Sequence, residues 1–213
     1  MGIREPVAFL RQTFSTFNTT GAVAPSSSYL ARAMVKHLPD DKDIPADFKV
    51  LEVGPGTGAF TAAIARKMNG CGSLQVYEIN SSFVAHLKAR VESEPDFQSM
   101  RGRMQITEGN ILELRPESKF DAIISGLPFN NFTPPDVRGF LDHFKTLIKP
   151  GGTLTFFEYV AVRELQMPFV SAARRERLRG IAKVVNEFAN AHQFDQKKVI
   201  LNVPPARARH LRF

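Results

Sequence analysis

The chain has 213 residues, of which 43% are hydrophobic, and this length suits one well-cored domain with little left over for a second. The formal net charge of +7 favours an anionic partner, either nucleic acid or a negatively charged membrane surface. Cys71 is the single cysteine, which excludes an internal disulfide and indicates a reducing compartment. Because no run of about 18 apolar residues is present, we expect no membrane span. The N-terminus lacks the apolar core and the small-residue cleavage site of a secretory signal, so we expect no export signal.

Strand and helix patterns alternate along most of the chain. Two helical patterns come first, at residues 5–18 and 26–38, and we treat 1–38 as an N-terminal helical extension and 39–213 as the main domain. Strands are predicted at 48–53, 73–79, 104–110, 120–129, 152–160 and 197–203, and helices at 59–68, 81–93, 135–149 and 171–192. The third of these helices is expected to end at Pro150 and Gly151, and residues 207–213 are read as a short terminal stretch. The alternation predicts an α/β fold with a mainly parallel sheet covered on both faces.

A glycine-rich turn follows the first predicted strand in "LEVGPGTGAF", residues 51–60. Gly54, Gly56 and Gly58 allow a tight turn and close approach of a ligand to the backbone. Glu52, just before the turn, suits an ammonium group better than a pyrophosphate. Glu78 ends the second strand, where a carboxylate can accept hydrogen bonds from both hydroxyls of a ribose. The turn therefore predicts a site for a nucleoside-like ligand with an amino group.

Four motifs in this order resemble the class I S-adenosylmethionine-dependent methyltransferases: "VLEVGPGTG", "YEIN", "EGNI" and "SGLPFNNF". The resemblance implies a Rossmann-like fold with a seven-stranded sheet and S-adenosylmethionine as cofactor, with S-adenosylhomocysteine as product. Asn110 stands where many enzymes of this class have Asp. The implied cofactor-binding residues are Glu52, Gly54, Pro55, Gly56, Thr57, Gly58, Glu78, Ile79, Asn110, Ile111, Ser125, Gly126, Leu127 and Pro128.

Within this class, "GAVAPSSSYLARAM", "SGLPFNNF" and "LNVPPA" resemble the bacterial phospholipid N-methyltransferases, which convert phosphatidylethanolamine to its methylated forms on the way to phosphatidylcholine. Enzymes that methylate nucleic-acid bases usually present Asn or Asp before Pro-Pro or Leu-Pro and an aromatic residue. Here Gly126 takes that first position, so the polar side chain that hydrogen-bonds a planar amino group in those enzymes is missing.

Aromatic residues after the fourth and fifth strands are candidates for the acceptor site. Phe129, Phe132 and Tyr159 could surround a methylated ammonium through cation–π attraction, and Glu158 could accept a proton. The alternative for the aromatic residues is core packing, and for Glu158 it is a solvated strand end. We name Tyr159, Glu158 and Phe129 as catalytic candidates.

Two basic or aromatic segments are candidates for membrane contact. The helix at 5–18 places Phe14 and Phe17 on one apolar face, which could enter a bilayer interface or pack on the core. Arg174 and Arg175 crowd the first turn of a predicted helix, where the helix dipole disfavours cations, so they could face lipid phosphate or lie on a solvated face. Tyr29 and Phe132 complete this predicted substrate and membrane surface.

The sequence therefore predicts a phosphatidylethanolamine N-methyltransferase that acts as a monomer on the cytoplasmic face of the cell membrane, without metal or nucleic acid. The residues leave three alternatives open. The same scaffold could methylate another amino lipid such as an ornithine lipid. It could methylate adenine in rRNA or tRNA, as "LPF" and the charge favour. It could also be a membrane-binding module without activity, against which the intact turn, Glu52 and Glu78 argue.

Overall fold

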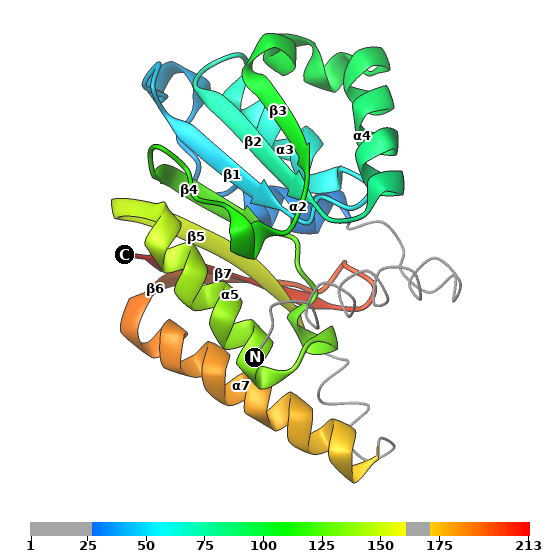
Figure 1. Cartoon of the computed structure of the whole chain (residues 1–213), viewed down its shortest axis with the longest axis vertical. Helices are drawn as coiled ribbons and strands as arrows, with labels where there is room; N and C mark the ends of the chain where they lie inside the picture. The colour runs from blue at the N-terminus through cyan, green and yellow to red at the C-terminus, as the bar shows by residue number, and fades with distance from the viewer. Residues whose placement is uncertain (1–26, 161–170) are drawn as a thin grey trace.

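The computed structural model describes residues 27–160 and 171–213 of the chain. Their strands form one sheet in the order β3-β2-β1-β4-β5-β7-β6 (Figure 1). The strands are β1 (Lys49–Val53), β2 (Ser73–Glu78), β3 (Met104–Glu108), β4 (Phe120–Ser125), β5 (Ile148–Tyr159), β6 (Gln193–Val199) and β7 (Ala206–Arg212). β1 to β5 pair in parallel, whereas β7 runs antiparallel to both β5 and β6. The mainly parallel sheet that the sequence predicted is confirmed.

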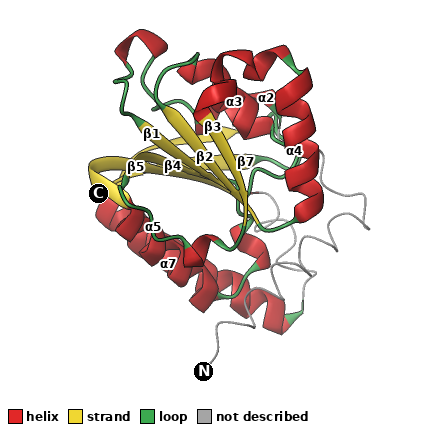
Figure 2. Ribbon diagram, turned by 45° about the horizontal axis from the view of Figure 1, so that its top comes forward, coloured by secondary structure: helices red, strands yellow, loops and turns green. Residues whose placement is uncertain are grey.

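Helices cover both faces of this sheet (Figure 2). The α-helices of the described residues are α2 (Ser28–Met34), α3 (Ala59–Met68), α4 (Ser81–Ser93), α5 (Pro134–Leu147) and α7 (Ala172–His192). Short 3-10 helices are η1 (Asp41–Asp43), η2 (Pro95–Arg103), η3 (Ile111–Glu113) and η4 (Phe129–Asn131). α2, α3 and α4 lie on one face, and α5 and α7 lie on the other.

The apolar core is divided by the sheet into two buried clusters. Successive side chains of a strand point to opposite faces, so Val50 joins the cluster under α2 and α3 while Leu51 joins the cluster under α5 and α7. Because both faces are covered, β1 reads as an almost unbroken apolar run in the sequence. Glu52 is the exception in this run, and it is completely buried.

The ends of α5 show where local signals worked and where they failed. Thr133 and Asp136 form a reciprocal capping box, and Pro134 occupies the first turn, as expected for a helix start. The predicted stop at Pro150 and Gly151 was wrong, because α5 ends at Leu147 and β5 begins at once. Ile148 pairs with Phe120 of β4, and the register shift that follows takes up the proline and the glycine inside the strand.

Two predicted strands are also shifted or shortened. β4 ends at Ser125, and the chain then turns into η4, so the strand predicted to residue 129 was too long. The strand predicted at 197–203 is β6 at Gln193–Val199, and residues 200–205 form the turn to β7. β7 itself was missed, because its apolar positions are mostly alanine and its charged Arg209 is buried by tertiary contacts.

The N-terminal helix of the described region is part of the domain core. α2 is shorter than the predicted helix at 26–38, and its Leu30 and Met34 are buried in the same cluster as residues of α3. The predicted helix at 5–18 lies outside the described residues. Among the residues that are described, no helix combines the length and apolar character needed to cross a bilayer.

Candidate active site

The carboxyl ends of β1 and β4 lie side by side at the point where the strand order reverses. In open parallel sheets this is where ligands bind, because the loops from the two strands leave toward opposite faces. Here the two loops touch: the Gly126 amide donates to the carbonyl of Val53 at 2.7 Å. A Cβ atom on Gly126 would lie 2.3 Å from the carbonyl oxygen of Gly54, so this contact requires glycine.

The glycine turn after β1 adopts backbone conformations that other residues avoid. Gly54, Gly56 and Gly58 have φ angles of +68°, +53° and +83°. A Cβ on Gly54 or Gly58 would collide with neighbouring side chains, whereas a Cβ on Gly56 would meet nothing within 4 Å. Gly54 and Gly58 therefore serve packing as well as the turn, and Gly56 borders open space above the sheet.

Glu52 is a buried carboxylic acid whose two oxygens lack hydrogen-bond partners among the described residues. Strand alternation turns it toward the face covered by α3, where Thr61 is its neighbour. Burial raises the pKa of Glu52 to about 8. The Thr61 hydroxyl and amide lie near enough to lower this pKa without completing a hydrogen bond to the carboxyl, and the charge of Glu78 adds a smaller increase. An unpartnered buried carboxyl of this kind suits a cationic ligand that would stabilise its ionised form.

Glu78 connects the end of β2 to the glycine turn. Its carboxylate accepts hydrogen bonds from the Asn80 amide at 2.9 Å and from the Gly56 amide at 3.2 Å. Burial raises the pKa of Glu78, and these backbone donors oppose that effect. The carboxylate therefore holds the turn in place while it lies at the edge of a cleft.

This cleft runs from the glycine turn to the end of β3. Its lining residues are Val53, Gly54, Tyr77, Glu78, Ile79, Gly109, Asn110, Ile111, Leu127 and Phe140. Asn110 also caps η3, because its Oδ1 accepts from the Leu112 amide at 3.1 Å. Of the predicted cofactor residues, the cleft brings together Gly54, Glu78, Ile79, Asn110, Ile111 and Leu127. Its lining does not include Glu52, Pro55, Gly56, Thr57, Gly58, Ser125, Gly126 or Pro128.

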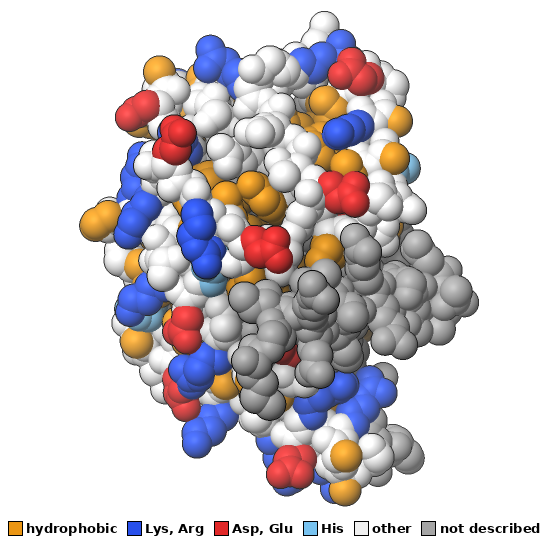
Figure 3. Space-filling model, viewed as in Figure 1, with side chains coloured by type: hydrophobic (Ala, Val, Ile, Leu, Met, Phe, Trp, Pro, Cys, Tyr) orange, Lys and Arg blue, Asp and Glu red, His pale blue; other side chains and the backbone are white. Residues whose placement is uncertain are grey.

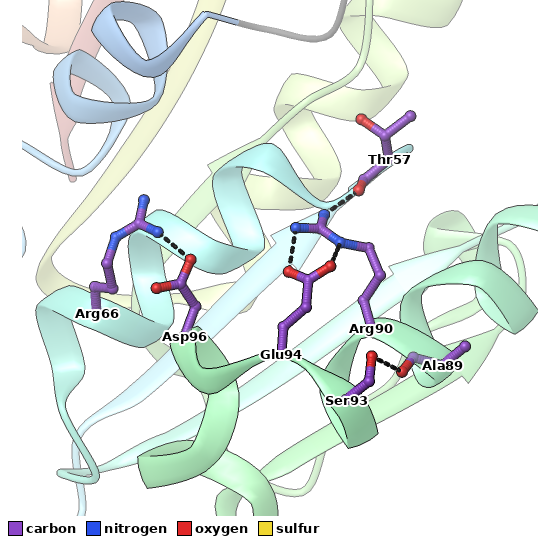
Figure 4. A network of polar contacts seen from close by, with 7 residues as sticks. All are labelled: Thr57, Arg66, Ala89, Arg90, Ser93, Glu94 and Asp96. Atoms are coloured by element: carbon purple, nitrogen blue, oxygen red, sulfur yellow. Dashed lines mark hydrogen bonds and ion pairs between the residues drawn. The ribbon is translucent and has the colours of Figure 1, made fainter.

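Arg90 of α4 braces the glycine turn from outside, a role that the sequence did not reveal (Figure 4). Its guanidinium makes two 2.6 Å hydrogen bonds to the Glu94 carboxylate and also donates to the carbonyl of Thr57. The i,i+4 spacing of Arg90 and Glu94 was a visible signal for the ion pair. The contact with Thr57, which is 33 residues away, depends on the tertiary structure.

The predicted catalytic residues fall on two faces of the sheet. Phe129 is buried against Phe156, with ring centroids 5.2 Å apart, and it belongs to the core under α5 and α7. Glu158 is buried on a 2.5 Å ion pair with Arg209, which argues against a role as proton acceptor. Tyr159 is partly buried on the opposite face, packed edge-on against Phe157 at 5.1 Å. Core packing thus describes Phe129 better than a catalytic role does. The solvated strand end that was the alternative for Glu158 is wrong, because Glu158 is buried in an ion pair.

The predicted membrane residues differ in how far they face solvent. Phe14 and Phe17 lie outside the described residues. Phe132 is buried against Phe140 at 5.2 Å, so core packing describes it better than contact with substrate. Tyr29 of α2 is exposed. Basic side chains gather around the start of α7, where Arg174 is exposed and Arg175 is half-buried (Figure 3).

The sheet order, the glycine turn after β1 and the carboxylate that ends β2 define the class I methyltransferase fold. The site also fits S-adenosylmethionine, because the oxygens of the buried Glu52 have no hydrogen-bond partner among the described residues and a Cβ on Gly56 would meet nothing within 4 Å. Glu52 would face the amino group of the cofactor, and Glu78 would take its ribose hydroxyls.

Comparisons with known proteins agree with this class. The family model described as "Methyltransferase domain" matches residues 50–152. The chain is 29% identical over 146 residues to an ornithine lipid N-methyltransferase of Singulisphaera acidiphila. The aligned region covers 68% of this chain and 73% of that protein. It is 30% identical over 119 residues to ribosomal RNA small subunit methyltransferase A of Geobacter metallireducens, covering 53% of this chain and 39% of that protein.

Among solved structures, the O-methyltransferase from Bacillus cereus in complex with SAH has the same fold, with a TM-score of 0.64 at 14% identity. The similarity covers 100% of this chain and 93% of that chain. The chain is an S-adenosylmethionine-dependent methyltransferase, and the predicted cofactor is confirmed. The roles of single residues in the cleft stay predictions.

Proposed function

We propose that this methyltransferase transfers methyl groups to the amine of a membrane lipid, with phosphatidylethanolamine as the first candidate substrate and an ornithine lipid as the second. The relative from Singulisphaera acidiphila, an ornithine lipid N-methyltransferase, supports a lipid amine as acceptor and favours the second candidate. The net charge of +7 suits an anionic membrane surface. The proposal puts the enzyme at the inner face of the cell membrane as a peripheral monomer.

The described residues contribute binding and orientation to this reaction. Bound S-adenosylmethionine supplies an electrophilic methyl group on a sulfonium. Glu52, whose pKa burial raises to about 8, would ionise when a cationic amino group binds and would then supply its countercharge. Glu78 and the glycine turn fix the ligand relative to the end of β4, where the acceptor amine must arrive. A displacement of this kind depends mainly on holding a neutral nucleophile in line and on excluding water.

The observation that carries the choice of acceptor is the missing side chain at residue 126. A base amino group is planar and needs hydrogen-bonding partners, which a side chain at this position usually supplies in enzymes that methylate nucleic-acid bases. Any side chain here would collide with the carbonyl of Gly54, because a Cβ would lie only 2.3 Å from its oxygen. A flexible primary amine, as in an ethanolamine or ornithine headgroup, needs no such planar grip. The geometry therefore supports an aliphatic amine.

The rRNA relative keeps adenine methylation as the second candidate function. The net positive charge is compatible with RNA, but binding of single-stranded bases typically uses exposed aromatic side chains as stacking platforms. Among the described residues, the exposed large aromatic side chains are Tyr29 and Phe194, and neither lines the cleft. A lipid amine therefore remains the better-supported acceptor.

A direct assay separates these candidates. Purified protein is mixed with methyl-labelled S-adenosylmethionine and one of three acceptors: vesicles that contain phosphatidylethanolamine, vesicles that contain ornithine lipid, or ribosomal RNA. We expect label in the lipid fraction only. Label in RNA and none in either lipid would overturn the proposal. More label in ornithine lipid than in phosphatidylethanolamine would make ornithine lipid the first candidate substrate.

A further inference from the structure

The turn between β6 and β7 exposes three large aliphatic side chains. Ile200, Leu201 and Val203 are 78%, 65% and 78% exposed. Among the described residues only two other large hydrophobic side chains are exposed, Tyr29 and Phe194, and Tyr29 lies beside this turn. Exposed aliphatic residues gathered in one place indicate an interaction site.

The turn is held by two hydrogen bonds of Asn202, one to Ser27 and one within the turn, so its backbone is defined where the aliphatic side chains face solvent. Asn202, between Leu201 and Val203, is buried. Its Oδ1 accepts from the Ser27 amide at 3.0 Å, and its Nδ2 donates to the carbonyl of Pro204 at 2.7 Å. The polar side chain thus faces inward and its apolar neighbours face solvent, which is the reverse of an ordinary surface turn.

Basic side chains border the same turn. A groove between α2 and the end of β6 is lined by Tyr29, Arg32, Ala33, Lys36, Lys197, Lys198, Val199, Ile200 and Leu201. Lys36 is paired with Asp195 at 2.7 Å. Arg32, Lys197 and Lys198 have no acidic partner within the described part of the chain. This surface therefore presents cations beside exposed aliphatic groups. We call Arg32, Lys197, Lys198, Ile200, Leu201 and Val203 the turn surface.

The turn surface lies at the same edge of the sheet as the cofactor cleft. The last residue of β5, Tyr159, pairs with Ala206 at the start of β7, and Ala206 pairs with Val199 at the end of β6. β5 is parallel to β4 and β1, so all of these strand ends are on the carboxyl side, as Figure 1 shows. A bilayer in contact with the turn would lie on the side from which an acceptor reaches the site.

We propose that the turn surface docks the enzyme on an anionic phospholipid bilayer, with Ile200, Leu201 and Val203 entering the interface and Arg32, Lys197 and Lys198 contacting lipid phosphate. The inference rests on the proposed lipid substrate and adds the orientation in which the enzyme meets it. Aliphatic side chains that enter the acyl boundary beside basic side chains that face anionic headgroups are the features of interfacial membrane binding.

The composition of the turn surface distinguishes a bilayer from other partners. A single-stranded RNA would be expected to stack on aromatic or planar side chains, whereas the exposed residues of the turn itself are aliphatic. A second copy of the chain would bring the same cations against themselves, because a symmetric contact pairs identical patches. Arg32, Lys197 and Lys198, which have no acidic partner in the described part of the chain, would then repel their own copies.

The test uses the full chain and its sedimentation with vesicles of equal parts phosphatidylglycerol and phosphatidylcholine. The first variant combines Ile200→Ser with Leu201→Ser, and the second combines Lys197→Ala with Lys198→Ala. The control combines Lys42→Ala with Lys119→Ala, which removes the same charge from exposed residues at the opposite edge of the sheet, before β1 and β4. All four altered positions of the turn surface are exposed, so the fold should not change.

We expect the serine variant to bind vesicles on the order of tenfold more weakly at every salt concentration. The alanine variant should lose on the order of tenfold in affinity at low salt, and this loss should shrink as salt screens the charges. The control should bind like the wild type. Both turn variants should still methylate a short-chain, water-soluble amino lipid, while methylation of lipid in vesicles falls.

Unchanged vesicle binding by both turn variants would overturn the inference, and so would a loss confined to RNA binding or to self-association. Failure of the proposed function is a separate result: the wild type would then methylate neither the soluble lipid nor the vesicles, while its vesicle sedimentation would still report on the turn surface.

Discussion

At the scale of single residues, Glu52 stands out as a buried carboxyl that no described residue compensates by a hydrogen bond. It is completely buried, its oxygens lack hydrogen-bond partners there, and its pKa is raised to about 8, chiefly by burial. The ionised form is therefore disfavoured in the free enzyme at neutral pH. A buried carboxyl with a strongly raised pKa is typical of functional sites, so we expect that a bound ligand compensates Glu52.

Glu52 gives a pH prediction for the free enzyme. Its folded-state pKa lies above its ordinary value, so its contribution to stability is present below about pH 4.5 and is lost as the pH rises through about 8. Replacing Glu52 with Gln should flatten the pH dependence over this window. The free energy of unfolding of wild type minus variant should fall by up to about 1.4 kcal/mol per pH unit.

Urea unfolding of both proteins between pH 5 and pH 9 measures this difference without cofactor. A difference that stays constant over that range would mean that Glu52 is ionised throughout, and would remove the argument for an unpaired carboxyl.

Gly56 gives a second prediction at this scale. Gly56→Ala should weaken S-adenosylmethionine binding strongly, because the added Cβ enters open space beside the cleft. Its φ of +53° should add a stability cost of about 1–2 kcal/mol. Calorimetric titration and urea unfolding measure the two effects separately.

Two matched variants test the assignment of Gly56. Gly56→Asn tolerates the left-handed conformation, so it should recover stability but not cofactor affinity. Gly58→Ala would place a Cβ 2.7 Å from a methyl carbon of Leu87, and it should damage the fold more than Gly56→Ala does. Normal cofactor affinity in both Gly56 variants would show that this glycine serves the turn alone.

At the scale of elements, the pair of Glu158 on β5 and Arg209 on β7 links the antiparallel strand to the parallel part of the sheet. The two side chains meet at 2.5 Å, and Arg209 also donates to Gln193 at 2.8 Å and to Asn186 at 3.3 Å. Both charges are buried, so each depends on the other. We therefore assign Glu158 to the stability of the β5–β7 pairing.

Arg209→Met should destabilise the protein by about 3–5 kcal/mol, because it leaves Glu158 buried without a countercharge. The double variant Glu158→Gln with Arg209→Met should recover part of this loss, since no unpaired charge remains. Chemical denaturation of the single and double variants measures the coupling. If Glu158→Gln lowered the rate of methyl transfer at saturating substrate while stability stayed normal, this would support Glu158 as the proton acceptor.

At the scale of the whole molecule, α2 joins the core although it precedes the first strand. Leu30 and Met34 are almost completely buried in the cluster that also contains residues of α3. The sequence analysis placed a domain boundary at residue 38. This boundary would separate α2 from the buried cluster to which α2 contributes Leu30 and Met34. We expect residues from α2 onward to unfold as one unit.

Met34→Ala should lower the free energy of unfolding by about 2–5 kcal/mol and shift a single thermal transition. Arg32→Ala, on the exposed side of the same helix, should leave the transition in place. Scanning calorimetry of both variants distinguishes a shared core from a separate extension. A new, independent low-temperature transition in Met34→Ala would favour a separate extension.

Local sequence signals were enough for the parts of this protein that depend on neighbours in the chain. Period-2 and period-3.6 patterns predicted the parallel strands and α3, α4 and α7 to within a few residues, and "LEVGPGTG" predicted the cofactor turn. Glu52 and Glu78 could be assigned to the site because strand ends in a parallel sheet meet at one edge. These inferences need only the chain direction and the spacing of residues.

Long-range contacts decided the rest. Glu158 and Arg209 are 51 residues apart in the chain, and only the antiparallel pairing of β7 with β5 brings them together. The same pairing carries the turn at residues 200–205 to the carboxyl edge, where Ile200 and Leu201 face solvent instead of completing a predicted strand. No periodicity encodes these positions, because they follow from which strands become neighbours. The sequence by itself determined the fold class and the cofactor turn, and the tertiary structure decided which charges are buried in pairs and which apolar side chains remain exposed.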